Sequence, residues 1–199
     1  KNTNLMVKLI GKDKLKTAIF ISGRGSNLKS LYKFSKKKIS SININLVISD
    51  NRNAKGLLFA KRKKIKNSTI NYSNKNIAER KIKILIKKNN IKLICLAGFM
   101  KILSKKFIKS FNGKILNIHP SLLPKYKGLN THKRVIDNRE KYSGCTVHFV
   151  NSKLDSGKII LQKKIKVAKN DNKQKLSNKI LRIEHKLYPA ALKKLFSNY

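Results

Sequence analysis

Short apolar segments alternate with longer stretches of helical periodicity along most of the chain, and this alternation is the feature that most constrains the fold. A segment such as Ile91–Leu96 is apolar at nearly every position, which is typical of a strand buried on both faces of a parallel sheet. Strands that alternate with helices indicate an open α/β sheet. The predicted strands are Lys16–Ser22, Ile42–Ser49, Ser68–Asn71, Ile91–Leu96, Lys114–Ile118, Cys145–Asn151 and Lys158–Lys166. The predicted helices are Ser26–Lys37, Ala54–Lys64, Asn76–Asn89, Lys105–Ser110, Thr131–Asn138 and Lys173–Phe196.

The last two predicted strands are joined by a short segment that contains Asp155-Ser156-Gly157. This connection is too short for a crossover helix, so we expect an antiparallel hairpin. The expected fold is therefore a single-domain, open, mostly parallel Rossmann-like sheet with helices on both faces and an antiparallel C-terminal hairpin. Residues 15–199 are expected to form this domain, and residues 1–14 a basic, poorly ordered extension.

The net charge of +41 would suit a nucleic-acid or anionic-membrane partner. However, the lysines are spread along the whole chain, and the aromatic residues do not alternate with basic ones as in a stacking platform. Lys, Ile and Asn all have A/T-rich codons and are abundant together, so a biased genome explains the charge better than selection for binding. We expect no specific nucleic-acid partner, and a monomer or weak homodimer.

The two cysteines, Cys95 and Cys145, form no paired framework and lie in apolar strand-like segments. This pattern favours buried, reduced thiols in a cytoplasmic protein. No apolar run reaches the roughly 18 residues that a membrane helix needs, so no membrane partner is expected.

The segment Ser22–Asn27 reads Ser-Gly-Arg-Gly-Ser-Asn, follows the first strand and opens a helix. Its glycines allow a tight turn, and free backbone N–H groups at a helix start favour a phosphate or carboxylate. Neither the dinucleotide-binding pattern nor the Walker A pattern is present. We expect Gly25, Ser26 and Asn27 to contact an anion; the alternative is a simple strand–helix turn in which Ser26 caps the helix.

Two further segments follow strand ends, where open α/β sheets bind ligands. Ala97–Leu103 is apolar and predicts either a slot for a flat heterocycle or simple packing. Asn117 and His119 stand in Asn-Ile-His-Pro-Ser-Leu-Leu-Pro, and Asp155 lies in a second turn. An amide, an imidazole and a carboxylate together can polarise a carbonyl group and move a proton. His148 is expected to support the Asp155 loop by hydrogen bonding, and the histidine spacing predicts no metal.

The motifs SGRGSNL, LAGFMKILS, NIHPSLLPKYKG, GCTVHFV and LDSGKIILQ follow one another as in phosphoribosylglycinamide formyltransferases, which the chain resembles from about Lys16 to Pro189. The resemblance implies transfer of a formyl group from 10-formyltetrahydrofolate to the amine of glycinamide ribonucleotide, in de novo purine (IMP) biosynthesis. The catalytic residues that it implies are Asn117, His119 and Asp155. The substrate contacts that it implies are Gly25, Ser26, Asn27 and Glu184, and the folate contacts are Lys75, Met100, Lys101, Ile102, Leu103 and Asn117.

Three positions depart from the family pattern. Lys75 and Lys101 stand where relatives often have Arg, so the charge is kept but the bidentate guanidinium is lost. Lys158 stands where many relatives have Pro. The first two departures bear on folate affinity, and the third on the rigidity of the Asp155 loop.

Three alternatives remain. Methionyl-tRNA formyltransferases share the NIHPSLLP segment but carry an additional C-terminal domain, whereas about 40 residues follow Asp155 here. Formyltetrahydrofolate hydrolases carry an N-terminal regulatory domain, for which about 15 residues leave no room. A basic nucleic-acid-binding module is the alternative from a different class; it would bind random duplex with a steep salt dependence and transfer no formyl group.

Overall fold

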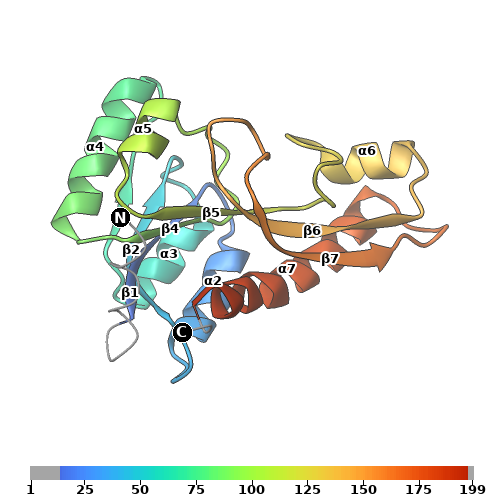
Figure 1. Ribbon diagram of the computed structural model, residues 1–199, viewed down its shortest axis with the longest axis horizontal. Helices are drawn as coiled ribbons and strands as arrows, with labels where there is room; N and C mark the ends of the chain where they lie inside the picture. Colours follow the sequence, from blue (N-terminus) through green and yellow to red (C-terminus); the bar gives the residue numbers. More distant parts are fainter. Residues whose placement is uncertain (1–13, 197–199) are drawn as a thin grey trace.

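The computed structural model describes residues 14–196, which form one seven-stranded sheet in the order β3-β2-β1-β4-β5-β6-β7 (Figure 1). The strands are β1 (Leu15–Ile21), β2 (Ile42–Ser49), β3 (Asn67–Thr69), β4 (Leu93–Leu96), β5 (Lys114–His119), β6 (Tyr142–Phe149) and β7 (Ile159–Lys166). Neighbouring strands from β3 to β5 are parallel, whereas β6 is antiparallel to both β5 and β7. The predicted mostly parallel sheet with an antiparallel C-terminal hairpin is confirmed.

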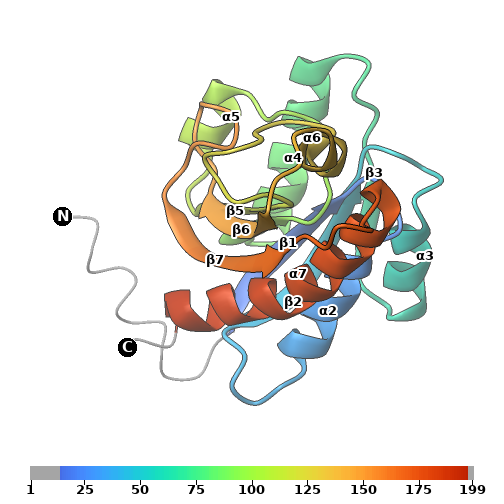
Figure 2. The ribbon, with the colours of Figure 1, turned by 90° about the vertical axis from the view of Figure 1, so that its right-hand side faces the viewer.

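Helices cover both faces of this sheet (Figure 2). They are α2 (Ser26–Ser35), α3 (Lys55–Arg62), α4 (Lys75–Lys88), α5 (Lys105–Ser110), α6 (Thr131–Asp137) and α7 (Lys173–Phe196). Side chains of β1 alternate between the two faces, so Ile19 and Ile21 join a core with α2, α3 and α7. Ala18 and Phe20 join a second core with α4 and α5. The near-continuous apolar strands therefore arise from burial on both faces.

Helix starts agree with local sequence chemistry at two positions. The side chain of Asn74 accepts a hydrogen bond from the backbone N–H of Ile77 and caps α4. Ser104 caps α5 in the same way, through the N–H of Phe107. Each cap satisfies one of the N–H groups that have no partner within the helix.

The start of β6 differs from the prediction. The sequence predicts a strand from Cys145, but β6 begins at Tyr142 and includes Gly144. A Cβ atom at position 144 would lie 2.1 Å from the carbonyl oxygen of Lys163 in β7. Gly144 therefore does not end the strand; it allows the neighbouring backbone to approach closely.

The pairing of β6 with β7 is irregular next to His148. Val147 pairs with Leu161 and His148 pairs with Ile159, so Ile160 is an extra residue in β7. Such a bulge increases the local twist and redirects side chains. The predicted Asp-Ser-Gly turn is part of a longer connection over residues 150–158, which carries Asp155.

The order of the strands positions the ligand-binding edge. From β1 the chain builds the sheet outward through β2 and β3, then returns to place β4 and β5 on the other side of β1. The loops after β1 and β4 therefore diverge to opposite faces, and such a switch point is where open α/β sheets bind ligands.

No helix within residues 14–196 is long and apolar enough to span a bilayer. The predicted basic extension lies outside the described residues except for Lys14.

Candidate active site

A cavity of about 740 Å³ lies at the carboxyl ends of β1, β4 and β5 and is bounded by α7 and by the β6–β7 connection. Its size is within the range of small-molecule sites. Of the residues predicted to act in a site, only Lys75 does not line it. The predicted residues that line it are Gly25, Ser26, Asn27, Met100, Lys101, Ile102, Leu103, Asn117, His119, His148, Asp155 and Glu184.

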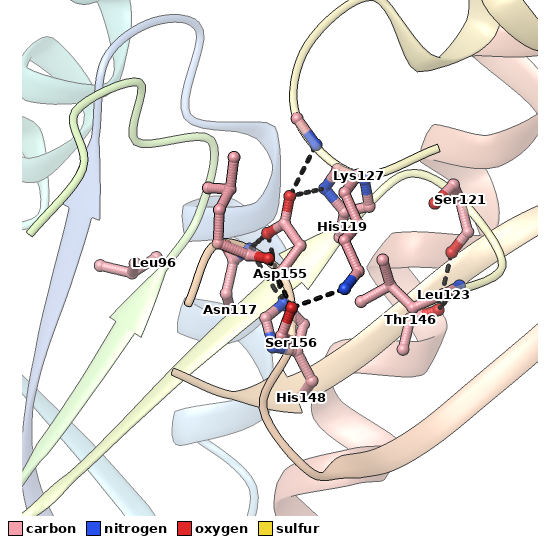
Figure 3. Close-up of polar contacts among 12 residues, drawn as sticks. Leu96, Asn117, His119, Ser121, Leu123, Lys127, Thr146, His148, Asp155 and Ser156 are labelled. Atoms are coloured by element: carbon pink, nitrogen blue, oxygen red, sulfur yellow. Dashed lines mark hydrogen bonds and ion pairs between the residues drawn. The ribbon is translucent and has the colours of Figure 1, made fainter. Parts of the chain in front are cut away.

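His119 and Asp155 both line this cavity, and their side chains contact each other (Figure 3). Nδ1 of His119 lies 3.3 Å from Oδ2 of Asp155, and both side chains are buried. Nε2 of His119 lies 2.8 Å from the carbonyl oxygen of Tyr126, which can only accept a hydrogen bond. Both ring nitrogens therefore face oxygen acceptors, and an imidazolium satisfies both of them.

Asn117 connects the same carboxylate to His148. Its Nδ2 atom lies 3.4 Å from Oδ1 of Asp155 and 3.2 Å from Nε2 of His148. Nδ1 of His148 donates to the carbonyl of Phe149 over 2.8 Å, so Nε2 of the neutral ring is an acceptor for the amide. Burial lowers the pKa of His148, although the Phe149 hydrogen bond and the charge of Asp155 oppose this shift. His148 thus holds the Asn117 amide in place, and its Nε2 lies 3.7 Å from the Asp155 carboxylate.

The backbone around Asp155 explains how the carboxylate reaches β5. Asp155 has φ +46°, and its Oδ2 atom accepts a 2.9 Å hydrogen bond from the backbone N–H of Gly128. Gly128 also has positive φ, +77°, a conformation that glycine adopts without steric cost. Two turns from separate parts of the chain therefore meet at this carboxylate.

The glycine-rich loop after β1 is held by close backbone packing. Gly25, with φ +70°, is the N-cap residue of α2, and no side chain caps this helix. The alternative role of Ser26 as the helix cap is therefore wrong. A Cβ atom at Gly25 would lie 2.7 Å from Cα of Gly56, at the start of α3. The backbone N–H of Gly56 donates to the carbonyl of Gly23 over 3.1 Å. The loop is thus supported by Gly56, which lies outside the loop and which the sequence patterns do not indicate.

Asn27 and Glu184 form a buried pair beside this loop. Nδ2 of Asn27 donates to Oε2 of Glu184 over 2.8 Å, while Oδ1 of Asn27 is buried without a partner among the described residues. Burial raises the pKa of Glu184 to about 7, although the Asn27 hydrogen bond lowers it. A buried carboxyl group in a cavity, with an unsatisfied amide oxygen next to it, indicates a polar ligand at this end.

The segment after β4 presents apolar side chains at the cavity entrance. Met100 and Ile102 are 61% and 62% exposed, whereas Leu103 is buried. Phe99 packs edge-on against Phe20, with ring centroids 5.4 Å apart. Exposed apolar side chains beside a cavity are typical of a surface that a flat ligand covers.

Sequence reasoning missed several backbone contributions. Tyr126 and Gly128 lie in the loop after the Pro-rich segment and supply a carbonyl and an N–H to the central groups. A Lys-Gly-Leu turn is the only local signal for them. Among residues 14–196 no group of three or more metal-ligating side chains comes together; the expectation that no metal takes part stays a prediction.

Comparison with protein families gives one match, to the formyl transferase family, over residues 15–192. The trifunctional purine biosynthetic protein adenosine-3 of Homo sapiens is 42% identical over 184 residues, which is 91% of this chain but only 18% of that protein. The phosphoribosylglycinamide formyltransferase of Haemophilus influenzae is 40% identical over 181 residues, covering 89% of this chain and 85% of that protein.

Solved structures agree in fold. The phosphoribosylglycinamide formyltransferase from Anaplasma phagocytophilum superposes with a TM-score of 0.88 at 39% identity and covers 94% of this chain and 88% of that chain. The enzyme of the same name from Bacillus halodurans has a TM-score of 0.88 at 33% identity, over 92% of this chain and 96% of that chain.

Proposed function

The chain belongs to the formyl transferase family, and from this membership we propose that it transfers a formyl group from 10-formyltetrahydrofolate to the amine of glycinamide ribonucleotide. The observation that carries the proposal is the contact of Asn117, His119 and Asp155 within one cavity. The likeness to phosphoribosylglycinamide formyltransferases over most of their length supports this choice of substrates.

In the proposed reaction the amine nitrogen of the ribonucleotide attacks the formyl carbon. The carbonyl oxygen becomes an oxyanion, which Asn117 and the His119 imidazolium stabilise by donating hydrogen bonds. The bond between the formyl carbon and the folate nitrogen then breaks. The proton lost by the amine moves to that folate nitrogen through a water molecule oriented by Asp155.

This proposal requires two of the hydrogen bonds described above to exchange partners. The contact of Asn117 Nδ2 with Asp155 is long, at 3.4 Å, so one amide hydrogen can turn to the substrate oxygen. Nε2–H of His119 donates to Tyr126 and would exchange that carbonyl for the oxyanion. Hydrogen bonds of this kind often reach their final geometry only with substrate bound.

The two ends of the cavity fit the two proposed ligands. The Gly25–Asn27 loop with its backbone N–H groups would bind the phosphate, and Glu184 would bind a polar group of the ribonucleotide. The exposed Met100 and Ile102 would contact the folate ring system, and Lys101 its negatively charged tail. Lys75 does not line the cavity, so a role for it would be confined to parts of the folate outside the cavity.

The test is a transfer assay with purified protein. Glycinamide ribonucleotide and 10-formyltetrahydrofolate are mixed with the protein, and deformylation of the folate is followed by absorbance. We expect deformylation that depends on the ribonucleotide. Deformylation without it would indicate a hydrolase, and transfer only to aminoacylated initiator tRNA would indicate the tRNA-specific alternative; either result contradicts the proposal.

A further inference from the structure

Ser22 connects the two segments that are proposed to bind the two ligands. It is the first residue after β1 and begins the glycine-rich loop. Its backbone N–H donates to the carbonyl of Gly98 over 3.1 Å, and its Oγ atom accepts a 2.8 Å hydrogen bond from the N–H of Met100. One residue therefore supports both the phosphate loop and the segment after β4.

Asp50, at the end of β2, fixes the direction of the Ser22 hydroxyl. Oγ of Ser22 donates its hydrogen to Oδ1 of Asp50. Because a hydroxyl has one hydrogen and two lone pairs, this donation leaves the lone pairs to accept from Met100. Hydrogen bonds to a carboxylate are stronger than those between neutral groups, so the hydroxyl is held in this orientation.

The second oxygen of Asp50 lies 3.8 Å from Nζ of Lys101. The lysine is 46% exposed, so this ion pair adds little free energy but keeps the cation beside the cavity. The far end of the same segment is held by a second carboxylate, because Glu79 accepts from the backbone N–H of Ser104 over 2.6 Å. The segment 98–104 is thus fixed at both ends.

We propose that Ser22, oriented by Asp50, couples the binding of the two ligands, so that occupancy of the phosphate loop tightens folate binding at Met100–Leu103. This inference rests on the proposed function. Asp50 does not line the cavity and acts through Ser22, so it is a positioning residue. The physical basis is a shared support: the two hydrogen bonds of Ser22 join the phosphate loop to the segment after β4, so a ligand bound at the loop favours the position of Ser22 in which Met100–Leu103 is placed for the second ligand.

The experiment is calorimetric titration of tetrahydrofolate, which carries no formyl group and cannot react, with and without saturating glycinamide ribonucleotide. Effects of this type usually change affinity about 5- to 150-fold, and the same factor must appear when the order of the ligands is reversed. We expect a factor of about 5 or more in the unmodified protein. In Ser22→Ala and Asp50→Ala the factor should fall towards one.

Two control variants separate coupling from general damage. Asp137→Ala changes the net charge as Asp50→Ala does, but it removes an exposed carboxylate on α6 that pairs with Lys133; it should keep the full factor. Asp50→Asn keeps an oxygen that can accept from Ser22, so it should keep most of the coupling. Melting temperatures of all variants show whether each one is folded.

Three results would overturn the inference: a factor of one in the unmodified protein, an unchanged factor in both alanine variants, or a loss in Asp50→Asn equal to that in Asp50→Ala. These results leave the proposed function standing if formyl transfer is observed. A protein that binds neither ligand and transfers no formyl group would overturn both.

Discussion

Asn27 donates a 2.8 Å hydrogen bond to Glu184, which lies 157 residues further along the chain. The bond joins the first turn of α2 to α7, and both side chains are buried. The wall of the cavity beside the phosphate loop is therefore built from opposite ends of the described chain.

The buried carboxyl group of Glu184 should make stability depend on pH. Burial raises its pKa from 4.5 to about 7, so between these values the folded protein holds a proton that the unfolded chain releases. The resulting stabilisation, up to about 3 kcal/mol, is complete below the lower value and is lost as pH rises through the higher one. Glu184→Gln keeps a neutral side chain, so its melting temperature relative to the unmodified protein should increase from about pH 5 to about pH 8. A constant difference over this range would contradict the shift.

Removing the amide of Asn117 should impair turnover without unfolding the protein. Loss of one oxyanion hydrogen bond usually costs about 2.7–4 kcal/mol, so Asn117→Ala should lower kcat on the order of 10²–10³-fold. Asp155→Asn should also lower kcat, because it removes the charge that faces His119. His185→Gln is the control, since His185 does not line the cavity. Near-normal turnover in either of the first two variants would contradict the catalytic assignment.

A methyl group at Gly56 should disturb the phosphate loop. A Cβ atom there would lie 2.4 Å from Cδ1 of Ile21 and 3.1 Å from Cα of Gly25. Gly56→Ala should therefore raise the KM for glycinamide ribonucleotide and cost about 1–3 kcal/mol of stability. Gly23→Ala is the matched control for stability, because a Cβ atom at Gly23 meets nothing within 4 Å. Steady-state kinetics of Gly56→Ala check the KM, and thermal melting compares the two variants; an equal loss of stability in both would refute this account of the loop.

The net charge of +41 should make stability rise with ionic strength. Repulsion among like charges disfavours the compact state, and the Debye length falls from about 30 Å at ~0.01 M salt to about 3 Å at ~1 M. Sodium and potassium chloride should raise the melting temperature equally, because screening depends on ionic strength. A melting temperature that does not change with salt would contradict this prediction.

The sheet was predictable because its strands carry the pattern of burial on both faces. Ile42–Ser49 and Lys105–Ser110 have the predicted bounds, since apolar runs and a Ser cap mark them locally. The predicted start of β6 was wrong because glycine in a sequence is a turn signal, and Gly144 was interpreted in that way. The structure shows instead that glycine is needed there because the backbone of Lys163 approaches closely.

The side chains of the candidate site were predictable because acidic residues and histidines are scarce in this chain. The chain has eight acidic residues and four histidines, so Asp155 and His119 were conspicuous at strand ends and in turns. Contacts made by the backbone, such as the carbonyl of Tyr126 and the N–H of Gly128, leave no residue-type signal. Ser22 and Asp50 were missed as a pair because their hydrogen bond joins loops that follow different strands.

The segments before and after Asp155 should differ in how well they tolerate insertions and deletions, because the segment after it leads into the bulge at Ile160 of β7. Deleting Ile160 would leave the pairs Val147–Leu161 and His148–Ile159 in register but would remove the bulge, and with it the extra twist next to His148. Residues 151–154, by contrast, form an exposed tip that borders the cavity. Insertions at this tip would resize the entrance and leave the carboxylate in place, so loop grafting aimed at larger formyl donors should begin there.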